Sequence, residues 1–237
     1  MSSTASWRTS ASVAFSLLAG CATPPATPTL LFHDDFNSAA SGSGQWIVEA
    51  EQPAQIIATN GALDIDTAAG VTVWFRPRLE GPVQIDFDAT AVAQGGPNDQ
   101  VSDLNVFWMA SNADGSAPFS SRRGGKFAEY NDLRTYYVGL GGNRNTTTRF
   151  RRYIGDPDLR PLLPEHDLSG GDVLLVPNRR QSITLLANGG VIEYRRDGKT
   201  LFRFEDHAPY VAGWFAFRTT SSHLRIERLR IFALRQH

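Results

Sequence analysis

Tyrosine, asparagine and arginine side chains gather in one stretch of the sequence, residues 129–153 (EYNDLRTYYVGLGGNRNTTTRFRRY). From Ser116 to Tyr153, eight Lys or Arg residues stand against two Asp or Glu, a local charge of +6 in a chain whose net charge is −1. This concentration favours a surface that binds a polar or anionic ligand, although a solvated basic edge would explain the same charge.

This set of residue types could remove a proton that lies next to a carboxylate. Arginine and amide side chains would neutralise the carboxylate, and a tyrosine would then take the proton. We predict Tyr137 as the base and Arg149 as its catalytic partner, while a structural role also explains a tyrosine in a strand. Further contacts with the ligand are predicted for Asn105, Phe107, Tyr130, Asn143, Asn145 and Arg151.

Two strands joined by a Gly/Asn turn, within residues 135–153, must position these side chains. Successive side chains of a strand point to opposite faces. In the first strand Tyr137 therefore points away from the core side of Val138. In the second strand Phe150 is the core residue, so Arg149 points to the same face as Tyr137.

A preceding strand, Asp103–Met109, has the same two-sided pattern. Its core face carries Leu104, Val106 and Trp108, and its other face carries Asp103, Asn105 and Phe107. The loop that follows, Asn112–Gly125, is long enough to serve as a lid or a binding loop. We expect these elements to form one wall of a binding groove.

Composition favours a single all-β domain. The chain has 237 residues, 41% of them hydrophobic and 11% aromatic, with 21 glycines and 13 prolines, and it has no long window of helical period. Short strands linked by turns are typical of this mixture. Asn60-Gly61 predicts a tight hairpin, and the broken alternation between Ile226 and Leu229 predicts a β-bulge. The near-neutral total charge gives no reason to expect nucleic-acid binding.

The N-terminus has the features of an export signal. Arg8 precedes a short run of apolar and small residues, and Leu18-Ala19-Gly20-Cys21 resembles a bacterial lipobox. We predict a signal peptide over 1–20, a lipid anchor on Cys21 at the start of a tether over 21–29, and a folded domain over 30–237. Cys21 is the only cysteine, so it forms no internal disulfide.

We therefore expect the protein to be attached to a membrane through the lipid on Cys21. The apolar run is too short to span a bilayer. Because Ala22 rather than Asp follows the cysteine, the expected location is the outer membrane, facing the periplasm or the surface.

Three segments carry a resemblance to a known family. They are Phe32–Asn37 (FHDDFN), Ile192–Phe202 (IEYRRDGKTLF) and Gly213–Thr220 (GWFAFRTT) followed by His223–Ile226. With them the chain resembles the concanavalin A-like lectin/glucanase superfamily over Leu31–Leu234. It is most similar to small bacterial members of plant-polysaccharide utilisation systems, including those found beside rhamnogalacturonan-degrading enzymes.

The resemblance implies a two-sheet antiparallel β-sandwich, or jelly roll, whose concave sheet forms a saccharide groove and whose first and last strands are neighbours. It also implies that the closing strands bring Arg218 into the groove for binding and His223 for catalysis. Asp34 and Asp35 could help to hold a structural calcium, as in some relatives; no other cofactor is expected, and the five histidines show no metal-ligand spacing.

Three functions fit this fold, because it hosts lectins, hydrolases and lyases. We favour a polysaccharide lyase that cleaves a uronate-containing glycan by β-elimination. A glycoside hydrolase is the first alternative, but the Glu-x-Asp-x-x-Glu signature is absent and the acids are scattered: Asp86 and Asp88, Asp103, Glu129 and Asp132, Glu193. A non-catalytic glycan-binding lipoprotein is the second, with aromatic stacking platforms at Phe107, Tyr130, Tyr137 and Trp214.

Overall fold

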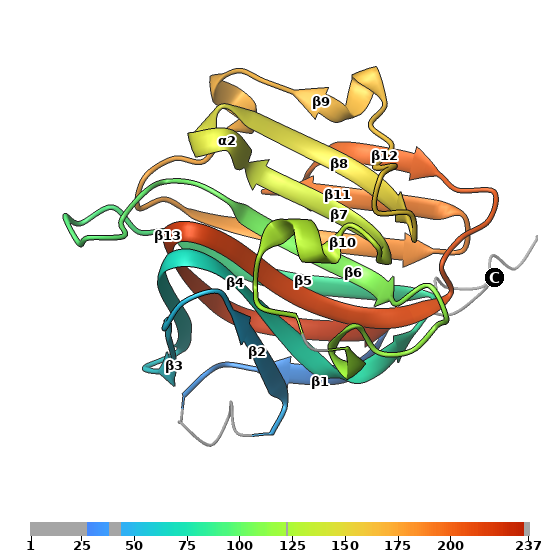
Figure 1. Cartoon of the computed structure of the whole chain (residues 1–237), viewed down its shortest axis with the longest axis horizontal. Helices are drawn as coiled ribbons and strands as arrows, with labels where there is room; N and C mark the ends of the chain where they lie inside the picture. Colours follow the sequence, from blue (N-terminus) through green and yellow to red (C-terminus); the bar gives the residue numbers. More distant parts are fainter. Residues whose placement is uncertain (1–27, 38–43, 122, 235–237) are drawn as a thin grey trace, which may run out of the picture.

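The computed structural model describes residues 28–37, 44–121 and 123–234. Within these ranges the chain forms one antiparallel sheet of 13 strands that curls into two layers (Figure 1). The expected all-β, jelly-roll class is confirmed. The two layers are continuous, because β4 and β13, of 19 and 22 residues, are long enough to belong to both.

The first layer is called the groove layer here. In spatial order it consists of β2 (Trp46–Ala50), β4 (Ala62–Glu80), the first half of β13 (Ala212–Ala233), β6 (Leu104–Ser111), β7 (Arg134–Gly141), β8 (Thr147–Ile154) and β9 (Asp167–Leu168). In Figure 1, β13 crosses the middle of the molecule and β6, β7 and β8 follow it in order on one side.

The second layer continues from the other half of β13. It consists of β5 (Val83–Ala91), β10 (Arg180–Asn188), β11 (Val191–Arg196) and β12 (Lys199–Glu205). The first strand, β1 (Thr29–Asp34), pairs with the end of β13, as the resemblance implied, and β3 (Gln55–Thr59) pairs with β4. Short helical elements lie in the connections: η1 (Pro118–Ser120), η2 (Phe127–Tyr130), α2 (Gly142–Asn145), η3 (Pro164–His166) and η4 (Gly171–Val173).

The core between the layers follows the alternation of the sequence. Leu104, Val106 and Trp108 of β6 and Val138 of β7 are buried there, and so is Phe150 of β8. The two-residue turn at Asn60-Gly61 joins β3 to β4, with Thr59 paired to Ala62. The bulge also forms, since the pairing of β13 with β5 shifts register between Glu227 and Arg230. Because these features depend on neighbouring residues, the pattern alone predicts them.

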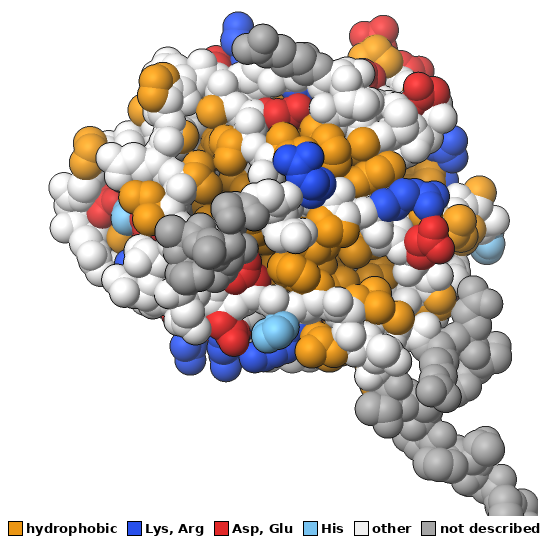
Figure 2. Space-filling view, turned by 90° about the horizontal axis from the view of Figure 1, so that it is seen from below, with side chains coloured by type: hydrophobic (Ala, Val, Ile, Leu, Met, Phe, Trp, Pro, Cys, Tyr) orange, Lys and Arg blue, Asp and Glu red, His pale blue; other side chains and the backbone are white. Residues whose placement is uncertain are grey.

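Strands β1, β2 and β3 lie at the bottom of the molecule in Figure 1, and Figure 2 shows the molecule from that side. Many apolar side chains show on this face, with Lys or Arg side chains among them and further charged groups toward the rim. The large exposed apolar residues of these strands are Leu30, Leu31, Val48 and Ile57. This surface is separate from the groove described below, whose lining residues come from other parts of the chain.

The predicted signal peptide, most of the tether and Cys21 lie outside the described residues. No helix in the described part of the chain is long and apolar enough to cross a membrane. Of the acids considered for calcium, Asp34 accepts a hydrogen bond from the Phe36 amide at 2.8 Å through Oδ1, while its Oδ2 is buried with no hydrogen-bond partner among the described residues; Asp35 lies 3.6 Å from Arg230. Over the described ranges, no three His, Cys, Asp or Glu residues are grouped so as to hold a metal ion.

Candidate functional site

Two rows of side chains cross the outer face of the groove layer, two residues apart along each strand. The polar row joins partners on successive strands, namely Thr72, Arg218, Asn105, Gly139 and Arg149. The aromatic row runs beside it and contains Trp74, Ala216, Phe107, Tyr137 and Arg151. Strand alternation turns both rows away from the core, so both could contact a ligand.

The aromatic row is largely covered by the loop that connects β6 to β7, residues 112–133. In Figure 1 its helical turns lie across β13 and β6. Tyr130 stacks on Phe107 with ring centroids 5.7 Å apart, and Phe127 lies 5.5 Å from the Tyr137 ring. Phe119 packs edge-on against Trp214 at 6.1 Å. These contacts make a second hydrophobic cluster outside the sheet.

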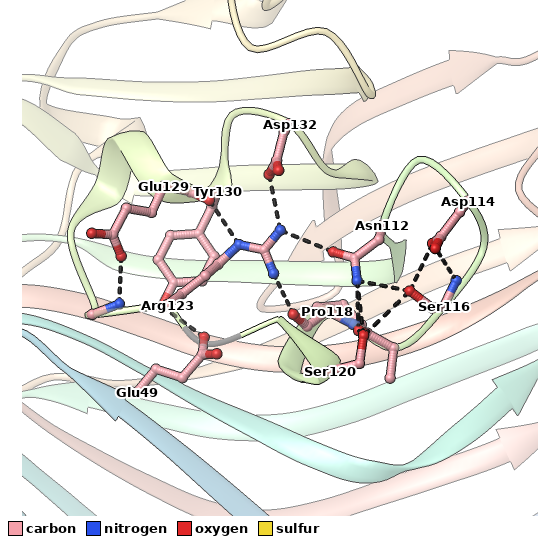
Figure 3. Close-up of polar contacts among 12 residues, drawn as sticks. Glu49, Asn112, Asp114, Ser116, Pro118, Ser120, Arg123, Glu129, Tyr130 and Asp132 are labelled. Atoms are coloured by element: carbon pink, nitrogen blue, oxygen red, sulfur yellow. Dashed lines mark hydrogen bonds and ion pairs between the residues drawn. The ribbon is translucent and has the colours of Figure 1, made fainter.

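Arg123 holds this loop in place (Figure 3). Its guanidinium donates to the carbonyl oxygens of Pro118 and Glu129, to Asn112 Oδ1 at 2.9 Å and to Asp132 Oδ1 at 2.9 Å. The side chain is only 6% exposed. A buried guanidinium with four acceptors fixes the loop strongly, because moving the loop away would leave the guanidinium without hydrogen-bond partners in a buried position.

Glu49 of β2 anchors the underside of the same loop. Its Oε2 accepts hydrogen bonds from Trp74 Nε1 and from Tyr130 Oη, both at 2.8 Å. Burial raises the pKa of the Glu49 carboxyl, and these two hydrogen bonds oppose the rise. Tyr130 is therefore a structural residue that ties the loop to the sheet.

Apart from Thr72, which is fully buried, the polar row forms the floor of a cavity of about 680 Å³. Its lining residues come from four strands and five connections: Glu51, Gln100, Ser102, Asp103, Asn105, Phe127, Tyr137, Gly139, Gly142, Asn143, Arg144, Thr147, Arg149, Arg151, Arg160, Arg218, Thr220 and Ser221. Its volume is typical of sites for small molecules or short oligomers. Five arginines and two acids give the lining a formal charge of +3.

Arg218 is the most enclosed of the five arginines, with 2% of the residue exposed. Its Nη1 donates to Thr72 Oγ1 at 2.8 Å and to the Gly125 carbonyl at 2.9 Å, and its guanidinium lies over the Phe127 and Tyr130 rings. Burial lowers the pKa of Arg218, and the nearby Tyr130, Tyr137 and Asp103 act in the opposite direction. Among the described residues no carboxylate forms an ion pair with it.

The β7–β8 hairpin supplies three further arginines. Arg149 forms an ion pair with Asp167 of β9 at 2.7 Å, and Arg151 Nη1 donates to the Arg160 carbonyl at 2.6 Å. Arg144 lies in the turn α2, where Asn143, Arg144 and Asn145 all have positive φ. The left-handed turn lifts Asn143 and Arg144 to the rim of the cavity.

Asp103 and Glu51 are the acids of the lining. Asp103 accepts hydrogen bonds from Ser102 Oγ and from Asn105 Nδ2, the latter at 3.3 Å. Burial raises the pKa of Asp103, although both hydrogen bonds and the charge of Arg218 act against the rise. Burial therefore favours the protonated form of this carboxyl, which is the direction that a general acid requires.

Comparison with known proteins places the chain in a family. The family described as domain of unknown function DUF6250 matches residues 65–229. The chain belongs to the DUF6250 family. A search of the curated proteins found no significant match.

Solved structures with the same fold include proteins named for carbohydrates. A protein of unknown function with a galectin-like fold from Bacillus subtilis is 16% identical, with a TM-score of 0.70 over 87% of this chain and 98% of the other. The carbohydrate-binding module CBM66 from Bacillus subtilis is 8% identical, with a TM-score of 0.55 over 80% and 96%.

The β-agarase A of Zobellia galactanivorans is 12% identical, with a TM-score of 0.56 over 91% and 97%. At these identities the likeness shows the fold, which is the galectin-like and concanavalin A-like fold that the resemblance predicted.

The structure of this DUF6250 protein brings six of the ten predicted site residues to the cavity. They are Asn105, Tyr137, Asn143, Arg149, Arg151 and Arg218. Phe107 is fully buried beneath Tyr130, and Tyr130 itself is fully buried, so neither is a platform for a ligand. Trp214 is covered by Phe119. These three predictions are wrong because the loop supplies its own aromatic rings to the same face.

Asn145 and His223 are also placed elsewhere. Asn145 pairs with Leu175 through both amide atoms, Nδ2 to the carbonyl and Oδ1 from the amide, each at 2.9 Å, so it is a structural link. His223 bonds Asp99 Oδ1 at 2.9 Å and Asp64 Oδ1 at 2.6 Å and does not line the cavity. The structure therefore places His223, predicted as catalytic, outside the cavity, beyond a register shift of β13 against β4 between Thr220 and Ser222.

The basic stretch of the DUF6250 chain divides between different environments. Arg152 forms an ion pair with Asp206 at 2.6 Å, and both Arg152 and Arg134 lie over the Tyr210 ring. Arg123 is in the loop anchor. Of the acids considered for hydrolysis, only Asp103 lines the cavity, and Asp88 is engaged by Arg228 and Ser182. The basic residues counted between Ser116 and Tyr153 therefore do not form a single surface patch.

Several lining residues were missed by sequence reasoning, among them Glu51, Phe127 and Arg160. Glu51 directly follows β2, and the other two lie in connections whose course depends on long-range contacts. The only available signal was length: residues 112–133 and 155–178 are the long connections that flank the predicted hairpin.

Proposed function

We propose that the protein binds an acidic glycan in the cavity over the polar row. The observation that carries this proposal is the lining itself: of Arg144, Arg149, Arg151, Arg160 and Arg218, only Arg149 has an ion-pair partner among the described residues. Arginines without carboxylate partners in a partly enclosed site favour a ligand that brings its own carboxylates. The fold supports a carbohydrate, since a carbohydrate-binding module shares it.

A lyase mechanism has weaker support than binding. Burial raises the pKa of the Tyr137 phenol well above its ordinary value, and the charges of Arg218 and Arg151 only partly oppose that rise. A phenol with a raised pKa is a poor base at neutral pH. His223, the other predicted participant, is held by two aspartates outside the cavity.

A glycoside hydrolase is the second candidate, and Asp103 is the observation that favours it. Asp103 and Glu51 line the same cavity, and burial raises the pKa of Asp103. One protonated and one ionised carboxyl are the pair that glycoside hydrolysis uses. Asp103 would donate the proton to the leaving oxygen, and Glu51 would act as base or nucleophile.

One panel of polysaccharides tests all three functions. We expect polygalacturonate, alginate or hyaluronan to bind, with dextran and laminarin as neutral controls, measured by titration calorimetry. Binding should weaken as salt is added. Absence of binding to every acidic member would overturn the proposal. Appearance of an unsaturated product by ultraviolet absorbance would establish the lyase, and release of reducing ends without that absorbance would establish the hydrolase.

A matched pair of arginine variants ties the binding to the cavity. Arg149 and Arg179 each pair with an aspartate 18 residues away, Asp167 and Asp197, but only Arg149 lines the cavity. Arg149→Ala should weaken binding of the acidic glycan about tenfold, the effect of one lost charge-assisted contact. Arg179→Ala should leave binding unchanged. Equal effects of the two substitutions would show that the cavity is not the site.

We also propose that the chain is exported and lipidated at Cys21, on the support of the Leu18–Cys21 sequence. Metabolic labelling with a palmitate analogue in a bacterial host should mark the wild type and spare Cys21→Ser. Labelling of both would contradict the proposal.

A further inference from the structure

We propose that this groove binds the end of an acidic glycan chain rather than its middle. The inference rests on the proposed function, and it depends on which sides of the cavity are closed. A groove for internal segments of a polymer must be open at both ends along its floor. The polar row here is closed at its β4 end.

Loop backbone makes that closure. The Gly125 carbonyl lies so close to Gly70 of β4 that a Cβ on Gly70 would collide with it, and a Cβ on Gly125 would collide with the backbone at Ala50 and Glu51. Arg218 reinforces the contact through its hydrogen bond to the Gly125 carbonyl. Backbone packed on backbone leaves no space between the loop and β4 for a saccharide.

A second wall runs along the side of the aromatic row. Phe127 from one loop and Arg160 from another face each other there, with the Arg160 guanidinium 5.8 Å from the Phe127 ring centroid. Arg151 holds Arg160 in place through the carbonyl of that residue. The open floor therefore spans β13, β6, β7 and β8, a width of about 14 Å at the usual spacing of neighbouring strands. This is room for a few sugar rings.

Two polar groups near the closed β4 end of the row lack hydrogen-bond partners. Asn105 is 3% exposed, and its Oδ1 accepts no hydrogen bond. Arg218 lies next to it in the polar row, and its Nη2 has no acceptor within the described part of the chain. Buried groups in this state favour a ligand that supplies partners. A terminal uronate would give a carboxylate oxygen to Arg218 and a hydroxyl proton to Asn105 Oδ1.

The number of chain ends provides the test. Polygalacturonate would be titrated into the full chain before and after partial acid hydrolysis, which multiplies the ends at constant mass; alginate or hyaluronan would be used in the same way if that is the polymer that binds. Binding capacity per gram should rise in proportion to the ends. Oligomers of three to six residues should bind with equal affinity per molecule.

Three outcomes distinguish a failure of end recognition from a failure of acidic-glycan binding. Capacity that stays constant with mass, or oligomers modified at both ends that bind as tightly as unmodified ones, would overturn end recognition while leaving acidic-glycan binding intact. Absence of binding to any acidic polymer would overturn the proposed function itself.

A pair of variants locates the recognised end. Asn105→Leu removes the free acceptor and should reduce oligomer affinity at least tenfold. Gln181→Leu is its control, because Gln181 of β10 is equally buried, with both amide atoms unpartnered, and does not line the cavity. Both substitutions can change stability, but only Asn105→Leu should change binding. Unchanged affinity of a folded Asn105→Leu protein would place the chain end elsewhere and overturn the assignment.

Discussion

The aromatic row is covered by a loop and the polar row is not, although the same strands carry both rows. Each row is produced by the same alternation, and the two are only two residues apart on β6, β7 and β8. Over the aromatic row, loop residues 112–133 build a second hydrophobic cluster. Over the polar row the face stays open. A ligand site thus arises where the loop stops, so the loop and the strands share in defining it.

The two loops beside the open floor are also held by different chemistry. Residues 112–133 are fixed by the guanidinium of Arg123 and by the carboxyl of Glu49. Residues 92–103, which carry Gln100, Ser102 and Asp103 to the cavity, are tied to β13 through the His223–Asp99 contact. The anchor of the first loop is a guanidinium and a buried carboxyl, whereas the contact of the second loop contains an imidazole, the side chain whose ordinary pKa lies nearest to neutrality.

Removal of the loop anchor should have the largest effect. Arg123→Ala leaves four acceptors, one of them buried and three at least partly exposed, without their donor and removes a buried side chain, so it should reduce the free energy of unfolding by about 3 kcal/mol. Urea unfolding followed by tryptophan fluorescence would measure it. Lys126→Ala, in the same loop but exposed, should change it by less than about 0.5 kcal/mol. Similar small changes in both would mean that the aromatic row does not depend on Arg123 for its cover.

Filling the open row is the next strongest change. A Cβ on Gly139 would lie 2.6 Å from Tyr137 Oη and 3.2 Å from Asn105 Oδ1. The Tyr137 ring cannot retreat, because Phe107, Phe127 and Tyr153 pack around it. Gly139→Ala should therefore cost about 1–3 kcal/mol of stability and reduce glycan affinity.

Gly171→Ala provides the control for this substitution. Nothing lies within 4 Å of a Cβ at Gly171, so stability and binding should both be preserved. If Gly139→Ala bound the glycan as tightly as the wild type, the floor of the cavity would not be in contact with the ligand.

The histidine contact should give a smaller effect that depends on pH. Burial opposes the charged form of His223, but its hydrogen bonds to Asp99 and Asp64 outweigh this, and the net result is a raised pKa. The folded state then binds the proton more tightly than the unfolded state. The resulting stability is fully present below the unfolded pKa of about 6.5 and is lost as pH rises through the higher folded pKa.

His223→Gln should therefore be less stable than the wild type below about pH 6.5, and the difference should shrink at higher pH. Thermal unfolding measured across this range would show it. Asp66 and Arg225 also face this cluster, and both are retained in the variant. A difference that stayed constant with pH would mean that the contact does not depend on the histidine charge.

Sequence reasoning predicted the sides of the strands better than it predicted what lies on them. The positions of Asn105, Tyr137 and Arg149 follow from alternation, which is a local rule, and the structure agrees. The burial of Phe107 and Tyr130 could not be predicted, because it depends on where a 22-residue connection packs. His223 was misplaced for a related reason: the register of β13 shifts between Thr220 and Ser222, and the sequence pattern did not predict this shift.

Tyr137→Phe should have the smallest effect, and it distinguishes catalysis from binding. The ring belongs to the aromatic row and the hydroxyl reaches the polar row over Gly139. If the protein only binds, loss of the hydroxyl removes at most one hydrogen bond and weakens affinity by less than about tenfold. If Tyr137 were the base of a lyase, formation of the unsaturated product would stop while binding persisted. Tyr194→Phe, which removes a buried hydroxyl outside the cavity, should change neither quantity.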